Sequence, residues 1–136
     1  VNATYYSALG ESDEKMLLAR AIQMFMPGKS QIWYLDLFAG KNDHEAVQRA
    51  GESGHKEINR TNLSTDQITE GLKKDVVQKQ LALIRMRNTH KAFSEGAEVA
   101  ISGGERSLEI RWEYNSAFAT LYVNFESGTY TIVESK

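Results

Sequence analysis

Four carboxylates in the first half of the chain have the side-chain type that general acid–base chemistry needs: Asp36, Asp43, Glu45 and Glu57. A positioned pair of such groups can donate and accept protons at a reacting bond. Asp36 lies near the carboxyl end of a predicted strand, where acidic residues are common. We therefore treat these residues as candidates by type alone, and we expect no independent catalytic pair in this chain.

Other residue types that carry chemistry give no motif. His44, His55 and His90 lack the spacing of metal ligands, so we expect three ordinary histidines and no metal site. Cysteine is absent, which excludes a disulfide framework and thiol chemistry. The glycines at 51, 54, 103 and 104 lack the strand–loop–helix context of a phosphate-binding loop. We predict no cofactor.

The overall composition excludes several classes of partner. The net charge of −2 and the absence of a basic stripe give no footprint for nucleic acid. No apolar run approaches the roughly 20 residues of a membrane span, and no signal peptide is present. A cytoplasmic location without membrane contact is the default expectation. The chain starts at Val1 without a methionine and continues directly into Ala3-Thr4-Tyr5-Tyr6, as an excised or tag-trimmed segment would, and as a processed one would too.

The elements that must position the candidate residues begin with a helix and a strand. Apolar residues recur at three- and four-residue spacing across 12–26, which predicts an amphipathic helix that stops at Pro27-Gly28. A short β-branched and aromatic run follows, and it predicts a strand over 31–37 with two apolar faces. A helix followed by such a strand is the repeating unit of a parallel α/β sheet. Because only one such strand is present, the chain resembles the tail of something larger.

A long polar connection, residues 39–62, follows the strand. A capping spacing at Asn42 predicts a short helix to about Arg49, and the glycine cluster after it predicts irregular loop. Connections this long are often functional, and a disordered insertion is the alternative. Beyond it, a capping box at Ser64 and Gln67 predicts a helix ending near Gly71.

The remaining chain changes character after a long helix over 74–90. Periodicity of two predicts strands over 98–101, 107–114, 117–125 and 129–133, joined by turn residues into an antiparallel meander. Four aromatic residues in the meander could stack on a sugar, although core packing is the favoured interpretation: Trp112, Tyr114, Tyr122 and Tyr130.

Three stretches, in order, resemble the carboxyl-terminal part of the α-amylase superfamily, glycoside hydrolase family thirteen: residues 27–34, residues 83–93 and the meander. The resemblance narrows to the sucrose phosphorylase group through several short motifs, at 5–10, 18–23, 39–43, 58–60 and 76–77. It is close over residues 1–93 and rests on pattern alone beyond them.

The resemblance implies an α/β portion, the last helix–strand–helix part of a (β/α)8 barrel at 1–93, followed by an all-β tail, a small antiparallel β domain at 94–136. Barrel enzymes place the active site at the carboxyl ends of their strands, so loop 39–62 would lie over the substrate. The group resembled transfers glucose from a glucoside to inorganic phosphate with retention, using carboxylates that precede this segment. We therefore expect no catalytic residue within this chain.

The resemblance also assigns substrate-binding candidates: His55, Lys56, Glu57, Arg60, Asp36 and Asp43. The group carries Gly-Arg-Asp-Ile-Asn-Arg, whose first arginine contacts the glucosyl unit. Here Lys56 takes the place of that arginine and Glu57 that of the aspartate, with one residue added before them. Lysine keeps the charge but loses the planar fork, and Asp36 replaces a small residue, so specificity for another glucoside is expected. A solvated basic loop, paired to Glu52 and Glu57, is the alternative interpretation.

Two functional hypotheses follow. The first is a segment of a retaining glucoside phosphorylase that is inactive alone, with a glucoside and inorganic phosphate as the substrates of the parent enzyme. The second is a free-standing carbohydrate-binding or protein-interaction module that forms a homodimer through the unpaired strand at 31–37, since an unpaired strand invites another chain.

Overall fold

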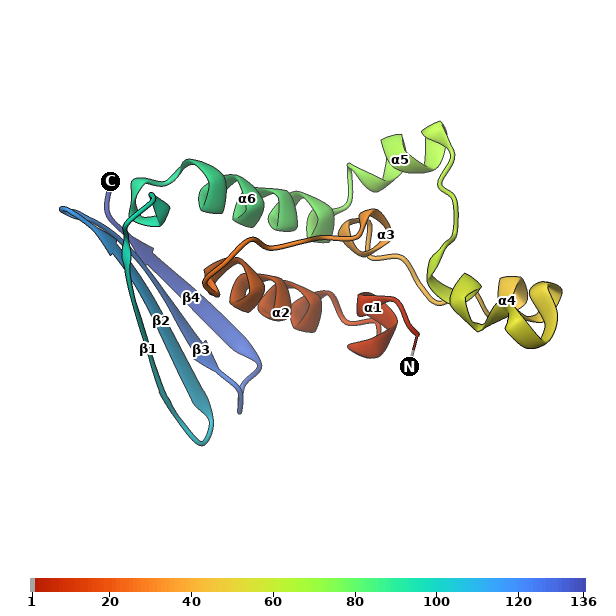
Figure 1. The fold of residues 1–136 in the computed structure, drawn as a ribbon, viewed down its shortest axis with the longest axis horizontal. Coiled ribbons are helices and arrows are strands. Elements are labelled where there is room, and N and C mark those ends of the chain that lie inside the picture. The colour runs from red at the N-terminus through yellow and green to blue at the C-terminus, as the bar shows by residue number, and fades with distance from the viewer. Residues whose placement is uncertain (1) are drawn as a thin grey trace. The chain divides into compact units, whose positions relative to one another are not determined.

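The computed structural model describes residues 2–136, which form helices followed by a four-stranded antiparallel sheet (Figure 1). The described residues group into two compact units. One contains the stretch up to Met16 together with Gln31–Lys79, and the other contains Leu17–Ser30 together with Gln80–Lys136. Helices α2 (Asp13–Phe25) and α6 (Asp75–Thr89) contribute residues to both units. No helix within residues 2–136 has the length and apolar character to cross a bilayer.

The first unit is built mainly from short helices, three of which begin at a polar capping side chain: Thr4, Asp43 and Ser64. The short helices are α1 (Tyr5–Ala8), α3 (Tyr34–Leu37), α4 (His44–Ala50), the 3₁₀ helix η1 (Gly51–Asn59) and α5 (Thr65–Gly71). The capping box predicted for α5 is confirmed, because the backbone N–H of Gln67 donates to Ser64 Oγ and that of Ser64 donates to Gln67 Oε1. Such reciprocal bonds satisfy two donors that the helix itself leaves open.

The predicted strand at 31–37 is wrong. Residues 29–33 have no regular structure, and a helical turn, α3, follows them. The N–H of Leu37 donates to the carbonyl of Trp33 at 3.1 Å, and the N–H of Phe38 to that of Tyr34 at 3.3 Å. A strand exists only through bonds to a neighbouring strand, and all the strands among residues 2–136 belong to the sheet at 98–134. The proposed dimerisation through this strand consequently loses its structural motive.

The connection 39–62 is ordered for most of its length, whereas irregular loop was predicted after Arg49. Helix α4 starts one residue later than predicted, because the cap is Asp43 and not Asn42, with Asp43 Oδ1 accepting from the N–H of Ala46 at 2.8 Å. Gly51, with φ of 70°, ends it and η1 begins there. The glycines that suggested a loop instead permit this sharp change of direction and the packing of η1 on α4.

The second unit contains the sheet, formed by β1 (Glu98–Gly104), β2 (Ser107–Tyr114), β3 (Ala117–Asn124) and β4 (Thr129–Glu134) in that spatial order. The predicted antiparallel meander is confirmed. Its inner face carries Ile110, Trp112 and Leu121, which are buried. Because strand side chains alternate, the residues between them form the outer face.

The inner face of the sheet packs against the ends of α2 and α6. The indole Nε1 of Trp112 donates to the carbonyl oxygen of Phe25 at 2.6 Å. The rings of Phe25 and Phe93 meet edge to face, with centroids 5.3 Å apart, and the guanidinium of Arg87 lies 4.2 Å from the centre of the Trp112 ring. These contacts make an aromatic core in which Arg87 supplies cation–π attraction. Burial lowers the pKa of Arg87.

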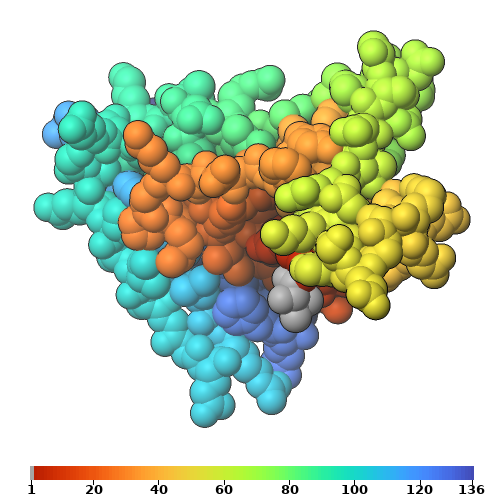
Figure 2. Space-filling model, turned by 45° about the vertical axis from the view of Figure 1, so that its right-hand side comes forward, coloured from red at the N-terminus to blue at the C-terminus, as the bar shows by residue number. Residues whose placement is uncertain are grey.

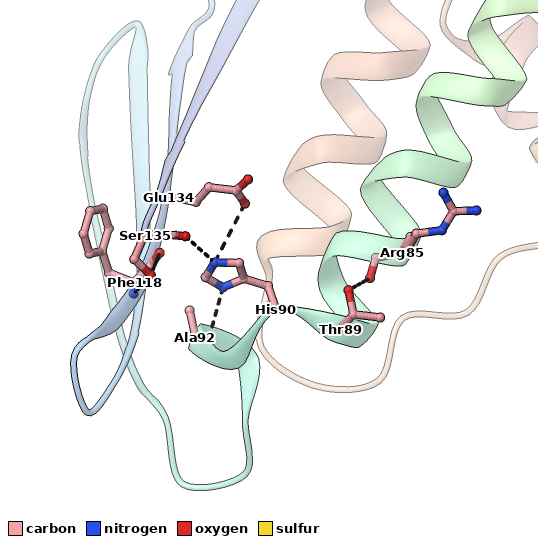
Figure 3. A network of polar contacts seen from close by, with 7 residues as sticks. All are labelled: Arg85, Thr89, His90, Ala92, Phe118, Glu134 and Ser135. Atoms are coloured by element: carbon pink, nitrogen blue, oxygen red, sulfur yellow. Dashed lines mark hydrogen bonds and ion pairs between the residues drawn. The ribbon is translucent and has the colours of Figure 1, made fainter.

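His90 connects the end of α6 to the end of β4 (Figure 3). Its Nδ1 accepts from the N–H of Ala92 at 3.1 Å and therefore carries no proton, so that Nε2 is the donor to the carbonyl oxygen of Ser135 at 3.0 Å. Ser135 Oγ in turn accepts from the N–H of Phe118 on β3 at 3.0 Å. The histidine thus has a structural role in the second unit.

Candidate substrate-binding site

A hollow of about 380 Å³ in the first unit is lined by Asn2, Trp33, Lys56, Asn59 and Arg60. Trp33 comes from the segment before α3, whereas Lys56 and Asn59 belong to η1 and Arg60 follows it. In the space-filling view, the surface of the segment before and within α3 (orange) adjoins that of the segment from α4 through η1 (yellow) (Figure 2). Two parts of the chain that are distant in sequence therefore form this hollow.

Hydrogen bonds to the backbone hold the two sides of the hollow together. Trp33 Nε1 donates to the carbonyl oxygen of Asn59 at 3.0 Å, and the hydroxyl of Tyr34 donates to the carbonyl oxygen of Thr61 at 2.6 Å. Asn59 Nδ2 donates to the carbonyl oxygen of Ala3 at 3.3 Å. The Trp33 indole is nevertheless 47% exposed, so one part of its surface is open to a ligand.

The position of η1 depends on its close packing against α4. The N–H of Asp43 donates to the carbonyl oxygen of Ile58 at 2.8 Å, which joins the start of α4 to the end of η1. Gly54 is buried, and a Cβ atom there would lie 2.8 Å from the carbonyl oxygen of Val47 and 2.4 Å from Cβ of Ala50. Only glycine therefore fits at this contact, which in turn places Lys56 and Arg60.

The predicted site residues divide into two groups. Lys56 and Arg60 come together at the hollow, and Glu57 forms an ion pair with Arg60 at 3.4 Å. His55 is exposed and does not line the hollow. Their assignment as substrate ligands stays a prediction.

The two aspartates among the predicted residues make bonds that stabilise the fold. Asp36 Oδ1 accepts from the N–H of Tyr5 at 2.7 Å. Asp43 caps α4, and its Oδ2 accepts from Thr61 Oγ1 at 3.3 Å. Neither carboxylate lines the hollow. Within the hollow the sequence prediction missed Asn2, Trp33 and Asn59. Asn59 lies in the Ile-Asn-Arg motif at 58–60, which could have indicated it, whereas Asn2 lies in no motif.

A charged pair fixes the start of the long connection. Lys41 Nζ lies 2.6 Å from Glu11 Oε2, and the hydrogen bond between them lowers the pKa of Glu11 and raises that of Lys41. The neighbouring Asn42 donates its N–H to Ser7 Oγ at 3.0 Å, while its Oδ1 accepts from the N–H of Thr4 at 2.7 Å. The segment between Ala3 and Glu11 is thereby tied to the connection.

The side chains at the hollow have the chemical character needed to bind a ligand. The indole of Trp33 offers an apolar plane, and Lys56 and Arg60 offer positive charge. The charge of Arg60 is balanced by its ion pair with Glu57. Within residues 2–136 no group of three or more potential metal ligands comes together. An aromatic plane beside ammonium and guanidinium groups suits a sugar that carries, or reacts with, an anionic group.

Comparison with known proteins identifies the class to which this arrangement belongs. No protein-family model matches the chain. The crystal structure of sucrose 6F-phosphate phosphorylase from Thermoanaerobacter thermosaccharolyticum superposes with a TM-score of 0.91 and 40% sequence identity, over 99% of this chain and 27% of that one. The helices and the antiparallel sheet thus match part of a sucrose phosphorylase structure.

Sequence relatives narrow the assignment. A sucrose 6(F)-phosphate phosphorylase of Ilumatobacter coccineus is 52% identical over 132 residues, which cover 97% of this chain and 25% of the relative. A sucrose phosphorylase of Agrobacterium vitis is 42% identical over 99% of this chain and 27% of the relative. The chain is therefore homologous to a segment of the sucrose phosphorylase group of glycoside hydrolase family thirteen, and it spans about a quarter of the length of these relatives.

Proposed function

We propose that the chain is the carboxyl-terminal segment of a retaining glucoside phosphorylase that transfers a glucosyl unit from sucrose, or from sucrose phosphorylated on its fructosyl part, to inorganic phosphate. The observation that carries this proposal is the similarity along nearly the whole chain, at 40–52% identity, to sucrose and sucrose 6F-phosphate phosphorylases. In this proposal residues 1–93 are part of the barrel and 94–136 the β domain.

The proposed reaction proceeds by two displacements at the anomeric carbon. An aspartate attacks that carbon while a glutamic acid protonates the departing fructosyl oxygen, and an oxygen of phosphate then displaces the enzyme carboxylate to give glucose 1-phosphate. In the family these carboxylates precede the segment described here. The segment's contribution is to bind and orient the substrate.

The hollow at Trp33 is proposed as that contribution. Lys56, at the place of the family's glucosyl-binding arginine, points a single charge at the site instead of a planar fork. Its position beside the exposed indole of Trp33 supports a role in holding the glucoside. Arg60, balanced by Glu57, would form the second cationic wall.

The complete protein encoded by the gene that contains this segment is expected to release glucose 1-phosphate from sucrose or sucrose 6F-phosphate in the presence of phosphate. The 136-residue chain alone is expected to release none, because the catalytic carboxylates are absent from it. A coupled assay of glucose 1-phosphate measures both. Turnover by the chain alone would contradict its proposed inertness, and failure of the complete protein on both substrates would refute the phosphorylase assignment.

Replacing Lys56 with alanine in the complete protein is expected to lower kcat/KM by about 10- to 100-fold, since a hydrogen bond to a charged group typically contributes about 1.5–3 kcal/mol. Lys56→Arg should retain most activity, because arginine keeps the charge and adds the fork. Lys73→Ala removes an exposed lysine whose partner is Glu70, away from the hollow, and serves as control. Equal kinetics for Lys56→Ala and Lys73→Ala would exclude Lys56 from substrate binding.

A further inference from the structure

The outer face of the sheet contains a second hollow, of about 410 Å³, whose lining includes Tyr122 of β3. Its lining includes Arg106 before β2, Asn124 and Glu126 at the end of β3, and Thr129 and Thr131 of β4. The volume falls within the range of small-ligand sites, about 300–1,000 Å³. This hollow belongs entirely to the second unit, and its argument does not depend on the proposed function.

Tyr122 presents an aromatic surface that the sheet does not need for its core. Ile110, Trp112 and Leu121 fill the inner face, whereas Tyr122 points to the opposite face and is 44% exposed. The register places Glu109 and Thr131 directly beside it on the neighbouring strands. An exposed tyrosine flanked by short hydroxyl and carboxylate side chains can stack on a sugar ring while its neighbours bond the ring hydroxyls.

The polar groups around Tyr122 bond to one another in the absence of a ligand. Asn124 Oδ1 accepts from the N–H groups of Glu126 and Ser127 at 2.9 and 3.0 Å, which leaves the NH₂ group of its side-chain amide as a donor. Arg106 pairs with Glu126 at 2.8 Å, and Ser127 Oγ lies 2.7 Å from Thr129 Oγ1. Preorganised polar groups lose little conformational entropy when they bind a ligand.

The charges at the hollow select an uncharged ligand. The positive charge of Arg106 is cancelled by Glu126, with which it forms an ion pair. Glu109, opposite Tyr122 on β2 and outside the lining of the hollow, adds a negative charge nearby. A phosphate or carboxylate would thus meet no net positive field, in contrast to the surroundings of Lys56. Hydroxyl groups, which both donate and accept, suit the mixture of amide, hydroxyl and carboxylate groups.

We propose that the hollow at Tyr122 on the outer face of the sheet is a binding site for a neutral saccharide, with one pyranose ring stacked on the tyrosine ring and its hydroxyls bonded by Asn124, Thr131 and the Arg106–Glu126 pair. Because the site is open and contains one aromatic ring, binding is in the millimolar range.

Titration of the ¹⁵N-labelled 136-residue chain with maltotriose, followed by two-dimensional NMR, tests this site. The expected result is a saturable shift of the amide signals of residues 106–107, 122–124 and 129–131, with smaller changes elsewhere. Glucose 6-phosphate, as a charged probe, should shift these signals less at equal concentration. Absence of saturable shifts with maltotriose, or stronger shifts with the phosphorylated sugar, would overturn the proposal.

Three variants distinguish the loss of ring stacking on the ligand from a disturbance of the sheet. Tyr122→Val keeps a strand-favouring side chain but removes the ring, and it should weaken maltotriose binding by about tenfold. Tyr122→Phe keeps the ring and should bind within about twofold of the original chain, as should the matched control Tyr114→Val, which removes an exposed tyrosine outside the hollow. Unchanged binding by Tyr122→Val, or equal loss in Tyr114→Val, would refute a site at Tyr122.

Discussion

Replacing Trp112 with alanine is expected to lower the free energy of unfolding of the second unit by about 3–5 kcal/mol, the usual range for removing a buried tryptophan. Trp112 is only 7% exposed and lies where the sheet meets the ends of α2 and α6. A loss of this size is a large part of the 5–15 kcal/mol that stabilises a typical domain. The unit should therefore melt at a much lower temperature.

Three contacts explain the magnitude. The indole fills space beside Phe93, with ring centroids 5.4 Å apart, and it lies under the guanidinium of Arg87. Its Nε1 also satisfies the carbonyl oxygen of Phe25. Alanine would leave a cavity and remove the aromatic partner of a half-buried cation at the same time.

Urea denaturation followed by circular dichroism measures the effect. Trp33→Ala is the matched control, because Trp33 is 47% exposed and belongs to the first unit, so its loss should change the free energy of unfolding of the second unit by less than about 1 kcal/mol. Trp112→Phe should fall between the two, since it keeps an aromatic ring but leaves the Phe25 carbonyl without its indole donor. If Trp112→Ala and Trp33→Ala proved equally stable, Trp112 would not be the centre of this core.

Sequence patterns that span a few residues correctly predicted the elements that depend on residues near in sequence. The capping box at Ser64, the long helix α6 and the four strands all appear as the sequence indicates, because caps, helical periodicity and alternation act over a few residues. The interpretation of the meander aromatics as core was correct for Trp112 and wrong for Tyr114, which is 37% exposed at the end of β2. Tyr122 also differs from that interpretation, since alternation places it on the outer face and only the structure gives its exposure.

Non-local partners explain the failures. An apolar run such as Ile32–Phe38 predicts a strand from composition, but a strand needs a hydrogen-bonded neighbour, and here the backbone of Trp33 and Tyr34 closes a helical turn instead. The 3₁₀ helix η1 was missed because glycine usually signals irregular structure, whereas Gly54 is required by the closeness of Val47. The hollow at Trp33 depends on both deviations, so the sequence predicted its cations and not its shape.

A second large effect is expected at a buried polar contact that periodicity also missed. Arg20 and Gln80 are polar, yet they are only 2% and 0% exposed. They lie on the buried sides of two helices whose other buried residues are mostly apolar. Arg20 Nε donates to Gln80 Oε1 at 2.9 Å, and Arg20 Nη1 also donates to Gln23 Oε1. A buried guanidinium is tolerated only because such acceptors replace water.

Gln80→Leu is therefore expected to lower the free energy of unfolding by about 3 kcal/mol, since it takes an acceptor from a charged group where water cannot replace it. Gln78→Leu, an exposed position on the same helix, should cost below about 1 kcal/mol. Adding Arg20→Met to Gln80→Leu should restore much of the loss, because both polar partners are then replaced by apolar groups of similar size. Urea denaturation of the original chain, Gln80→Leu, Arg20→Met and the double variant gives the coupling energy between the two side chains directly. The contradicting result would be additivity, in which Arg20→Met lowers the free energy of unfolding by the same amount in the original chain and in Gln80→Leu. The two side chains would then be energetically independent, and the buried contact would have no stabilising role.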